Sequence, residues 1–156
     1  MRLCHVSFVS RALATLVALS AGPALCADGF EFSARGGQVL GAGSQVGADL
    51  WIPMGPRVHF TPNLEHVFKA NYNDTSLNAD LRLDVPTSGS VRVWFGLGIG
   101  GVFQDGRQPG MEDETKLVTN FVSGVGFRSG RLTPYIQAKV ARTDETDFSL
   151  GFGLRF

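Results

Sequence analysis

The sequence predicts an all-β protein, an eight-stranded antiparallel up-and-down barrel. Apolar and polar residues alternate in eight segments, as they do in strands with one apolar face, and no segment shows a helical period of comparable quality. The connections also alternate, between tight turns and longer polar loops. That succession is typical of a meander whose longer loops all lie at one end.

The residues before the first alternating segment predict a secretory signal peptide. Arg2 and Arg11 flank its positive part, and the apolar core at 12–21 (ALATLVALSA) is too short for a membrane helix, which needs about 20 residues. Small residues place the cleavage after Cys26 or Ala27. Lipidation of Cys26 is an alternative that Leu25 disfavours. We therefore expect residues 1–26 to be removed and residues 27–156 to form the barrel.

Composition narrows the possible functions of the mature chain. Both cysteines, Cys4 and Cys26, lie in the signal, so no disulfide framework remains. Loss of Arg2 and Arg11 leaves 12 basic against 14 acidic side chains, which does not suggest a nucleic-acid partner. No later stretch approaches 18 consecutive apolar residues, so no membrane helix is expected. No phosphate-binding loop or metal-ligand spacing occurs, and no cofactor is expected.

The first four alternating segments are 30–35, 45–52, 57–68 and 77–85. The fourth is the most regular, because its apolar residues alternate with Asn78, Asp80, Arg82 and Asp84. Pro62 interrupts the third, since proline has no N–H to donate to a neighbouring strand. A bulge there would turn Asn63 and Glu65 toward the apolar face, so we expect a locally open ladder instead.

The other four segments are 91–103, 116–127, 131–140 and 148–156, and the alternation is weaker in 116–127. Tight turns are expected at 54–56, 86–89 and 128–131. Longer loops are expected at 36–44, 69–76, 103–115 and 142–147. An even number of strands then places both ends of the barrel domain on the tight-turn side.

The size of the side chains decides which face points outward. The apolar set faces inward in lipocalins, but the interior of an eight-stranded barrel is barely wide enough for side chains to fill. The apolar set here is bulky, with phenylalanine at 30, 32, 60, 68, 95, 103, 121, 127, 148, 152 and 156. The opposite set is rich in glycine. We therefore expect the bulky set to face lipid, as in a transmembrane β-barrel, rather than to form a generic half-buried sheet.

Phenylalanines near the ends of the segments predict two aromatic belts at the membrane interfaces. The belt on the tight-turn side comprises Phe30, Phe127 and Phe156, and the belt on the loop side comprises Phe68, Phe103 and Phe148.

The final segment, with Phe152, Leu154 and Phe156 on one face, resembles the C-terminal signal of bacterial outer-membrane β-barrel proteins. The whole mature chain is similar to small eight-stranded barrels of the OmpA/OmpX type, of the porin superfamily kind. This resemblance implies insertion into the bacterial outer membrane by the barrel-assembly machinery, which reads those three residues. It also implies contact with outer-membrane lipid and lipopolysaccharide. A monomer is expected.

The inward-facing set predicts a lumen filled by paired charges, because an unpaired charge in so narrow a space is strongly disfavoured. The predicted network comprises Glu31, Arg35, Asp49, Arg57, Glu65, Asp80, Arg82, Asp84, Arg92, Lys139 and Arg155. Trp94, Tyr135 and His59 fill more of the same space. We therefore expect a closed, non-enzymatic barrel that serves envelope integrity or surface interaction.

Two other functions stay open: a small pore and a lipid A-modifying enzyme. Some outer-membrane barrels of this size act on lipid A with a histidine and a serine at the rim. His66 falls on the lipid-facing set near the loop side, but Ser76 falls on the opposite set, so no catalytic residues are assigned. Acidic residues of the loops could hold divalent cations, but a solvated loop surface is the preferred explanation. No metal site is assigned.

Overall fold

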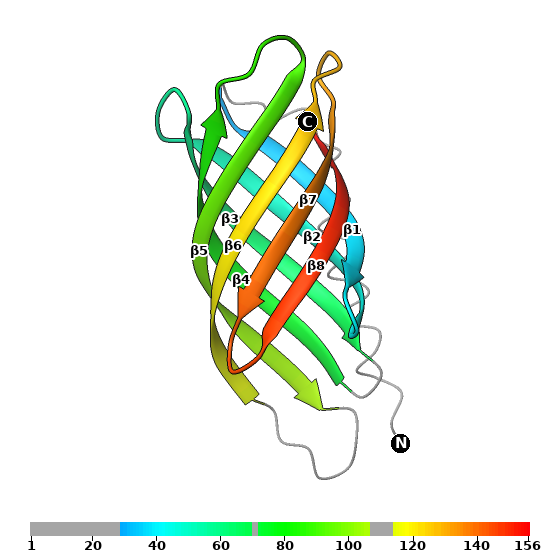
Figure 1. The fold of residues 1–156 in the computed structure, drawn as a ribbon. Coiled ribbons are helices and arrows are strands. Elements are labelled where there is room, and N and C mark those ends of the chain that lie inside the picture. Colours follow the sequence, from blue (N-terminus) through cyan, green and yellow to red (C-terminus); the bar gives the residue numbers. More distant parts are fainter. Residues whose placement is uncertain (1–28, 70–71, 107–113) are drawn as a thin grey trace. The chain divides into compact units, whose positions relative to one another are not determined.

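Antiparallel strands close into a barrel in the computed structural model, which describes residues 29–69, 72–106 and 114–156 (Figure 1). Within these ranges there are eight strands: β1 (Glu31–Val39), β2 (Gly43–Pro53), β3 (Val58–Lys69), β4 (Tyr72–Val85), β5 (Val91–Gly106), β6 (Glu114–Phe127), β7 (Thr133–Arg142) and β8 (Thr146–Arg155). The predicted signal peptide at 1–26 lies outside the described residues, so its cleavage stays a prediction. No helix in the described part of the chain is long and apolar enough to cross a membrane.

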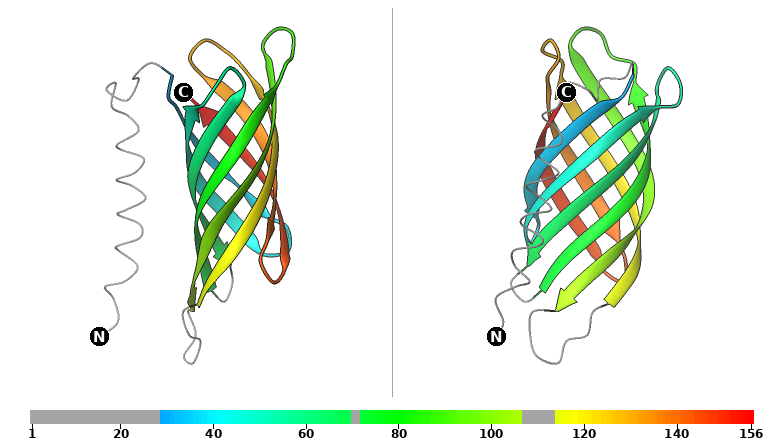
Figure 2. Two further views of the ribbon diagram at one scale, coloured as in Figure 1. Left: turned by 90° about the vertical axis from the view of Figure 1, so that its left-hand side faces the viewer. Right: turned by 180° about the vertical axis from the view of Figure 1, so that it is seen from behind.

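The order of the strands confirms the predicted up-and-down topology. Each strand pairs with its neighbour in sequence, and β1 pairs with β8 to close the barrel. The closure extends to Phe156, whose N–H donates to the carbonyl of Phe32 at 2.9 Å and whose carbonyl accepts from Phe32 N–H at 2.8 Å. Figure 2 shows the strands tilted around the barrel in both views. Closure leaves no strand edge to recruit other chains.

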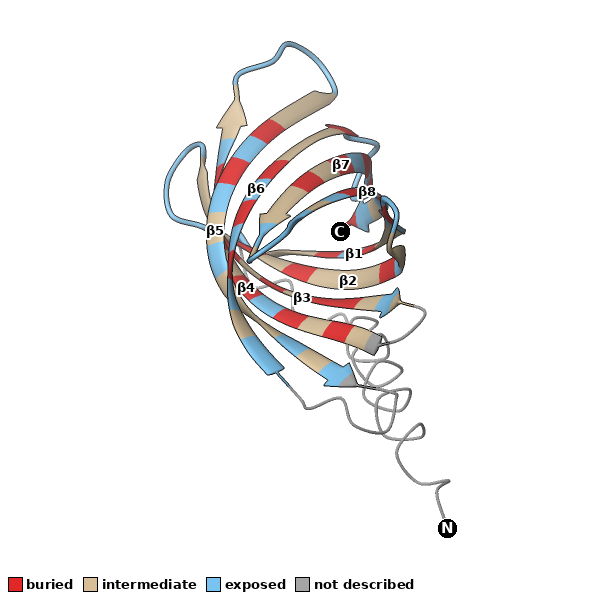
Figure 3. Ribbon diagram, turned by 60° about the horizontal axis from the view of Figure 1, so that its bottom comes forward, coloured by how far each residue is buried: buried red, intermediate tan, exposed pale blue. Residues whose placement is uncertain are grey.

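The two faces of the strands differ as predicted. Burial mostly alternates along the strands in Figure 3, because side chains of successive residues point alternately into the lumen and away from it. Glu65 and His66 of β3, which are both buried, are an exception. Asp49 in the lumen is 1% exposed, whereas Leu97 on the outer face is 68% exposed. The predicted belt residues are all exposed: Phe30, Phe127 and Phe156, and Phe68, Phe103 and Phe148. The outer surface is therefore apolar and the buried interior polar, which is the reverse of a water-soluble protein.

The connections differ from the prediction at the loop side. Longer loops were expected at 36–44, 69–76 and 142–147, but β1 continues to Val39, β4 already begins at Tyr72, and β7 and β8 are joined by residues 143–145. Only the connection between Gly106 and Glu114 is longer, and its residues 107–113 lie outside the described ranges. The error has a physical reason: Gly36 and Gly37 resemble turn residues but lie within β1, paired with β2. The turn itself uses Gly41, whose φ of 77° favours glycine.

Pro62 produces the locally open ladder that the sequence predicts. The β2–β3 register runs from Gly43↔Lys69 to Asp49↔Asn63 and resumes at Ile52↔Phe60 in the same register. Leu50 and Trp51 therefore have no ladder partner in β3, and no bulge shifts the faces. On the other side, β3 stays paired with β4 through Pro62.

Candidate functional site

The centre of the lumen holds a buried ion network made by five strands. Asp49 on β2 accepts from Arg35 on β1 and from Arg82 on β4, the latter at 3.1 Å. Arg82 also contacts Asp80 at 2.9 Å, and Arg35 reaches Glu65 on β3, which in turn pairs with Lys139 on β7. These six side chains are the central network, and its three acidic and three basic groups balance.

A second group of charges lies nearer the end of the barrel where β1 begins and β8 ends. Glu31 lies 3.2 Å from Arg155 and 3.5 Å from Arg92, and Asp84 lies 3.2 Å from His59. The guanidinium of Arg155 also stacks 4.3 Å from the ring of Trp51. Arg155 is almost fully buried, and these contacts give its charge one acidic and one aromatic neighbour in place of water.

Arg57 was predicted to join the lumen network, and the structure places it elsewhere. It lies in the connection between β2 and β3, is exposed, and forms no ion pair among the described residues. The prediction failed because β3 begins only at Val58, so the alternation that would turn Arg57 inward does not extend to it. Nine of the other ten predicted network residues take part in ion pairs, and the tenth, Asp84, contacts the His59 ring.

An aromatic layer fills the lumen beside the charges. Trp51, Trp94 and Tyr135 are buried, and neighbouring rings pack edge to face with centroids 5.5 Å apart. The Tyr135 hydroxyl donates to Ser33 Oγ at 3.2 Å, which connects the layer to Asp49. A Cβ added at Gly124 would clash with the Trp94 ring, and one at Gly153 would clash with Tyr135. The lumen glycines therefore match large side chains on adjacent strands.

Three asparagines form a directional chain of hydrogen bonds that sequence reasoning missed. Asn120 donates to Asn78 Oδ1 at 2.8 Å, Asn78 donates to Asn63 Oδ1 at 3.1 Å, and Asn63 donates to Asp80 Oδ2 at 2.9 Å. We call Asn120, Asn78 and Asn63 the amide chain. It crosses over β5 where Gly98 and Gly100 lack side chains, and a Cβ at Gly100 would clash with Asn78. The sequence pattern could have indicated this cluster, since all three asparagines belong to the inward-facing set.

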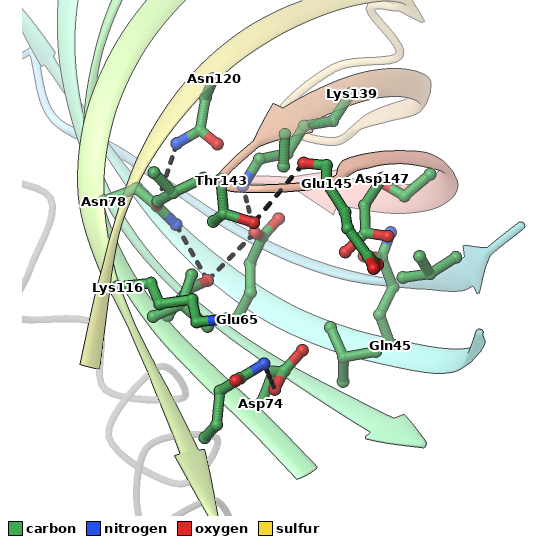
Figure 4. Close-up of a pocket in the computed structure, with 18 of the residues that line it drawn as sticks. Gln45, Glu65, Asp74, Asn78, Lys116, Asn120, Lys139, Thr143, Glu145 and Asp147 are labelled. Carbon is green, nitrogen blue, oxygen red and sulfur yellow. Dashed lines mark hydrogen bonds and ion pairs between the residues drawn. The ribbon is translucent and has the colours of Figure 1, made fainter. Parts of the chain in front are cut away.

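A cavity of about 350 Å³ occupies the end of the lumen where β7 and β8 are joined (Figure 4). Its floor includes the buried residues Gln45, Glu65, Asn78, Asn120 and Lys139. Its rim carries most of its charges: Lys69, Asp74, Glu114, Lys116, Asp144, Glu145 and Asp147. No three histidine, cysteine or acidic side chains of the described residues are placed to hold one metal ion together.

The structure also places the residues considered for catalysis and assembly. His66 Nδ1 lies 2.9 Å from Thr75 Oγ1, and its ring packs on Phe68, whereas Ser76 hydroxyl donates to Glu65 at 3.4 Å inside the lumen. His66 and Ser76 thus have different partners. The proposed assembly residues point outward, with Phe152 71%, Leu154 47% and Phe156 40% exposed.

Solved structures share this fold at low sequence identity. The N-terminal β-barrel domain of Pseudomonas aeruginosa OprF aligns with a TM-score of 0.69 at 12% identity, over 81% of this chain and 96% of that one. Neisserial surface protein A (NspA) aligns with a TM-score of 0.69 at 13% identity, over 82% and 96%. The outer membrane enzyme PagL aligns with a TM-score of 0.56 at 12% identity, over 81% and 98%. The sequence matches no protein-family model and no curated protein.

These similarities define the fold. The chain has the eight-stranded, closed, antiparallel architecture of small outer-membrane β-barrels such as OprF and NspA. Identities of 12–13% do not carry an activity across.

Proposed function

We propose that the protein is a non-enzymatic barrel of the bacterial outer membrane that serves envelope integrity or surface interaction, with a closed lumen. The apolar outer face supports a place in lipid, because such a surface would aggregate in water. Similarity to a neisserial surface protein supports a place at the cell surface. Lipid and lipopolysaccharide would then surround the barrel, and a monomer suffices because closure leaves no strand edge unpaired.

The observation that best supports a closed lumen is that its side chains form one continuous set of contacts. The central network joins β1, β2, β3, β4 and β7, and the aromatic layer packs directly against it through Tyr135 and Trp51. Side chains therefore occupy the centre of the lumen, which is narrow in any eight-stranded barrel. The polar interior needs no transport role to explain it.

The purified, folded barrel is expected to conduct no ions in a planar bilayer. The buried Arg35 and Arg82 bridge carboxylates from different strands, so opening a continuous path would break several ion pairs at once. Single-channel recording measures this directly. Steady, reproducible openings from folded protein would support the pore instead.

Lipid A modification is the second candidate, since PagL shares the fold and is an outer membrane enzyme. Mass spectrometry of lipid A from cells with and without the gene separates the two functions. We expect identical acyl patterns. An altered pattern that a His66→Ala variant abolishes would establish the enzyme and contradict our proposal.

Assembly is expected to depend on Phe156. Its ring lies 5.5 Å from that of Phe32 across the closure, and it belongs to the proposed signal with Phe152 and Leu154. Phe156→Ala should lower the yield of folded barrel in the outer membrane of a Gram-negative host. Phe148→Ala is the matched control, because Phe148 is exposed on the same face at the opposite end of β8. Equal yields for the two variants would argue against a signal at Phe156.

A further inference from the structure

Asn120 has a buried hydrogen-bond acceptor without a partner among the described residues, and the residue lines the cavity. Asn120 is 3% exposed, and the acceptor is its Oδ1. Figure 4 shows this oxygen on the side of the amide away from Asn78. An unsatisfied buried acceptor is costly, so this position favours a ligand that brings a donor.

The amide chain fixes which atom Asn120 presents. A carboxylate can only accept, so Asp80 requires the amide nitrogen of Asn63, and each following amide must then donate in the same direction. Rotating Asn120 alone would place its oxygen against Asn78 Oδ1, another acceptor. The free atom at the end of the amide chain is therefore an oxygen.

A row of paired residues leads from Asn120 to a carboxylate. Asn120 pairs with Ala141, and Ala141 pairs with Asp147, so the three residues form one row across β6, β7 and β8. Neighbouring strands lie about 4.8 Å apart, which puts the Asn120 and Asp147 backbones roughly 10 Å apart. The small side chain of Ala141 lies between them, and all three residues line the cavity. An ammonium group, which has three N–H donors, matches these two acceptors.

The rim of the cavity carries the matching charge. The central network is balanced, but the rim sets five carboxylates against Lys69 and Lys116, an excess of three negative charges. Lys69 pairs with Asp74 and Asp147, and Lys116 pairs with Glu114 and Asp144. The carboxylates are spread around the rim and do not converge as ligands of one metal ion. This distribution favours an extended polycation over a compact ion.

We propose that the cavity binds a linear aliphatic polyamine. One terminal ammonium donates to Asn120 Oδ1 and to Asp147, and the other charged nitrogens lie among the rim carboxylates, including Glu145. This site goes beyond the proposed function, because a closed barrel needs no ligand.

Titration calorimetry with spermidine tests the proposal on the mature barrel, folded in neutral detergent without lipopolysaccharide. We expect saturable binding of one spermidine per barrel that an equal concentration of Mg²⁺ does not displace. Asn120→Leu should weaken binding about tenfold or more, because a hydrogen bond to a charged group is lost. Ala141→Leu should weaken it by filling the gap. Asp105→Asn, which removes an exposed carboxylate outside the cavity lining, is the control and should leave the affinity unchanged.

Ala141→Leu keeps the proposal testable if Asn120→Leu disturbs the amide chain, since Ala141 makes no side-chain hydrogen bond. The electrophoretic shift between heated and unheated samples checks that each variant is folded. Non-saturable binding, displacement by equimolar Mg²⁺, or an unchanged affinity in folded Ala141→Leu would each overturn the polyamine site. Such a failure leaves the closed lumen intact, because conductance is measured separately.

Discussion

Asp49→Asn is expected to lower the free energy of unfolding by about 3–5 kcal/mol, the usual cost of removing one partner from a buried ion pair. Asp49 is 1% exposed and serves two cations, Arg35 and Arg82, as well as the Ser33 hydroxyl at 2.7 Å. The neutral amide has nearly the same shape but leaves both guanidinium groups without their shared counter-charge. Urea unfolding in lipid vesicles, followed by tryptophan fluorescence, measures the change.

The control for this variant is Asp144→Asn. Asp144 is exposed and lies 3.1 Å from Lys116 at the rim, where water screens the pair, so the stability should not change measurably. If Asp49→Asn is as stable as the parent, water must solvate the network and the lumen cannot be closed as we propose. Equal losses for both variants would point to a general effect of charge instead.

Leu97→Arg is expected to cost ~2–4 kcal/mol in lipid, because a charged side chain near the bilayer midplane is strongly disfavoured. Leu97 lies in the middle of β5 on the outer face and is 68% exposed. Leu81, its partner on β4, should behave in the same way. Reversible unfolding from vesicles gives the energy.

A residue nearer the membrane interface provides the matched control for Leu97. Leu117 is 75% exposed on the same outer face but lies near the loop end of β6, where arginine should cost only about 0–1 kcal/mol. A small cost at Leu97 would show that this face is not in the hydrocarbon. A large cost at Leu117 would place the membrane boundary farther toward the loops.

The alternation of inward and outward side chains made most of the fold predictable. A period of two assigns every residue of a strand to one face, so the outward position of Phe95 or Leu97 and the inward position of Asp49 or Arg82 follow from sequence alone. The open ladder at Pro62 followed for the same reason, since only an unshifted register keeps Asn63 in the lumen.

The ends of the strands could not be predicted in this way. Gly36 and Gly37 are typical of turns, yet in the barrel they continue β1, because pairing with β2 satisfies their backbone groups. Arg57 gave the opposite error: an alternating pattern continued into a residue that the chain uses for a turn. Local sequence does not state how far a hairpin stays paired beyond the apolar belt.

The partners within the lumen also needed the structure. Arg82 meets Asp49 across β3, and Asn120 meets Asn78 across β5, so neither contact joins adjacent strands. Such contacts depend on the tilt of the strands and on the gaps left by glycines such as Gly100. The alternation along a strand shows which residues point inward, but it does not give their positions along the barrel axis.

The β1–β8 seam has one more consequence, for the width of the barrel. Every other pair of adjacent strands is joined by its own connection, whereas the alignment of the seam depends only on what its residues contact. A slip by one residue would turn Arg155 into hydrocarbon and Phe156 into the filled lumen. A slip by two would keep the faces but change the shear, which sets the diameter for a given strand number. It would also move Arg155 by about 7 Å relative to β1, away from the Trp51 ring on the neighbouring β2 that its guanidinium contacts. The fit of this arginine against the Trp51 indole therefore helps to fix the diameter of the whole barrel.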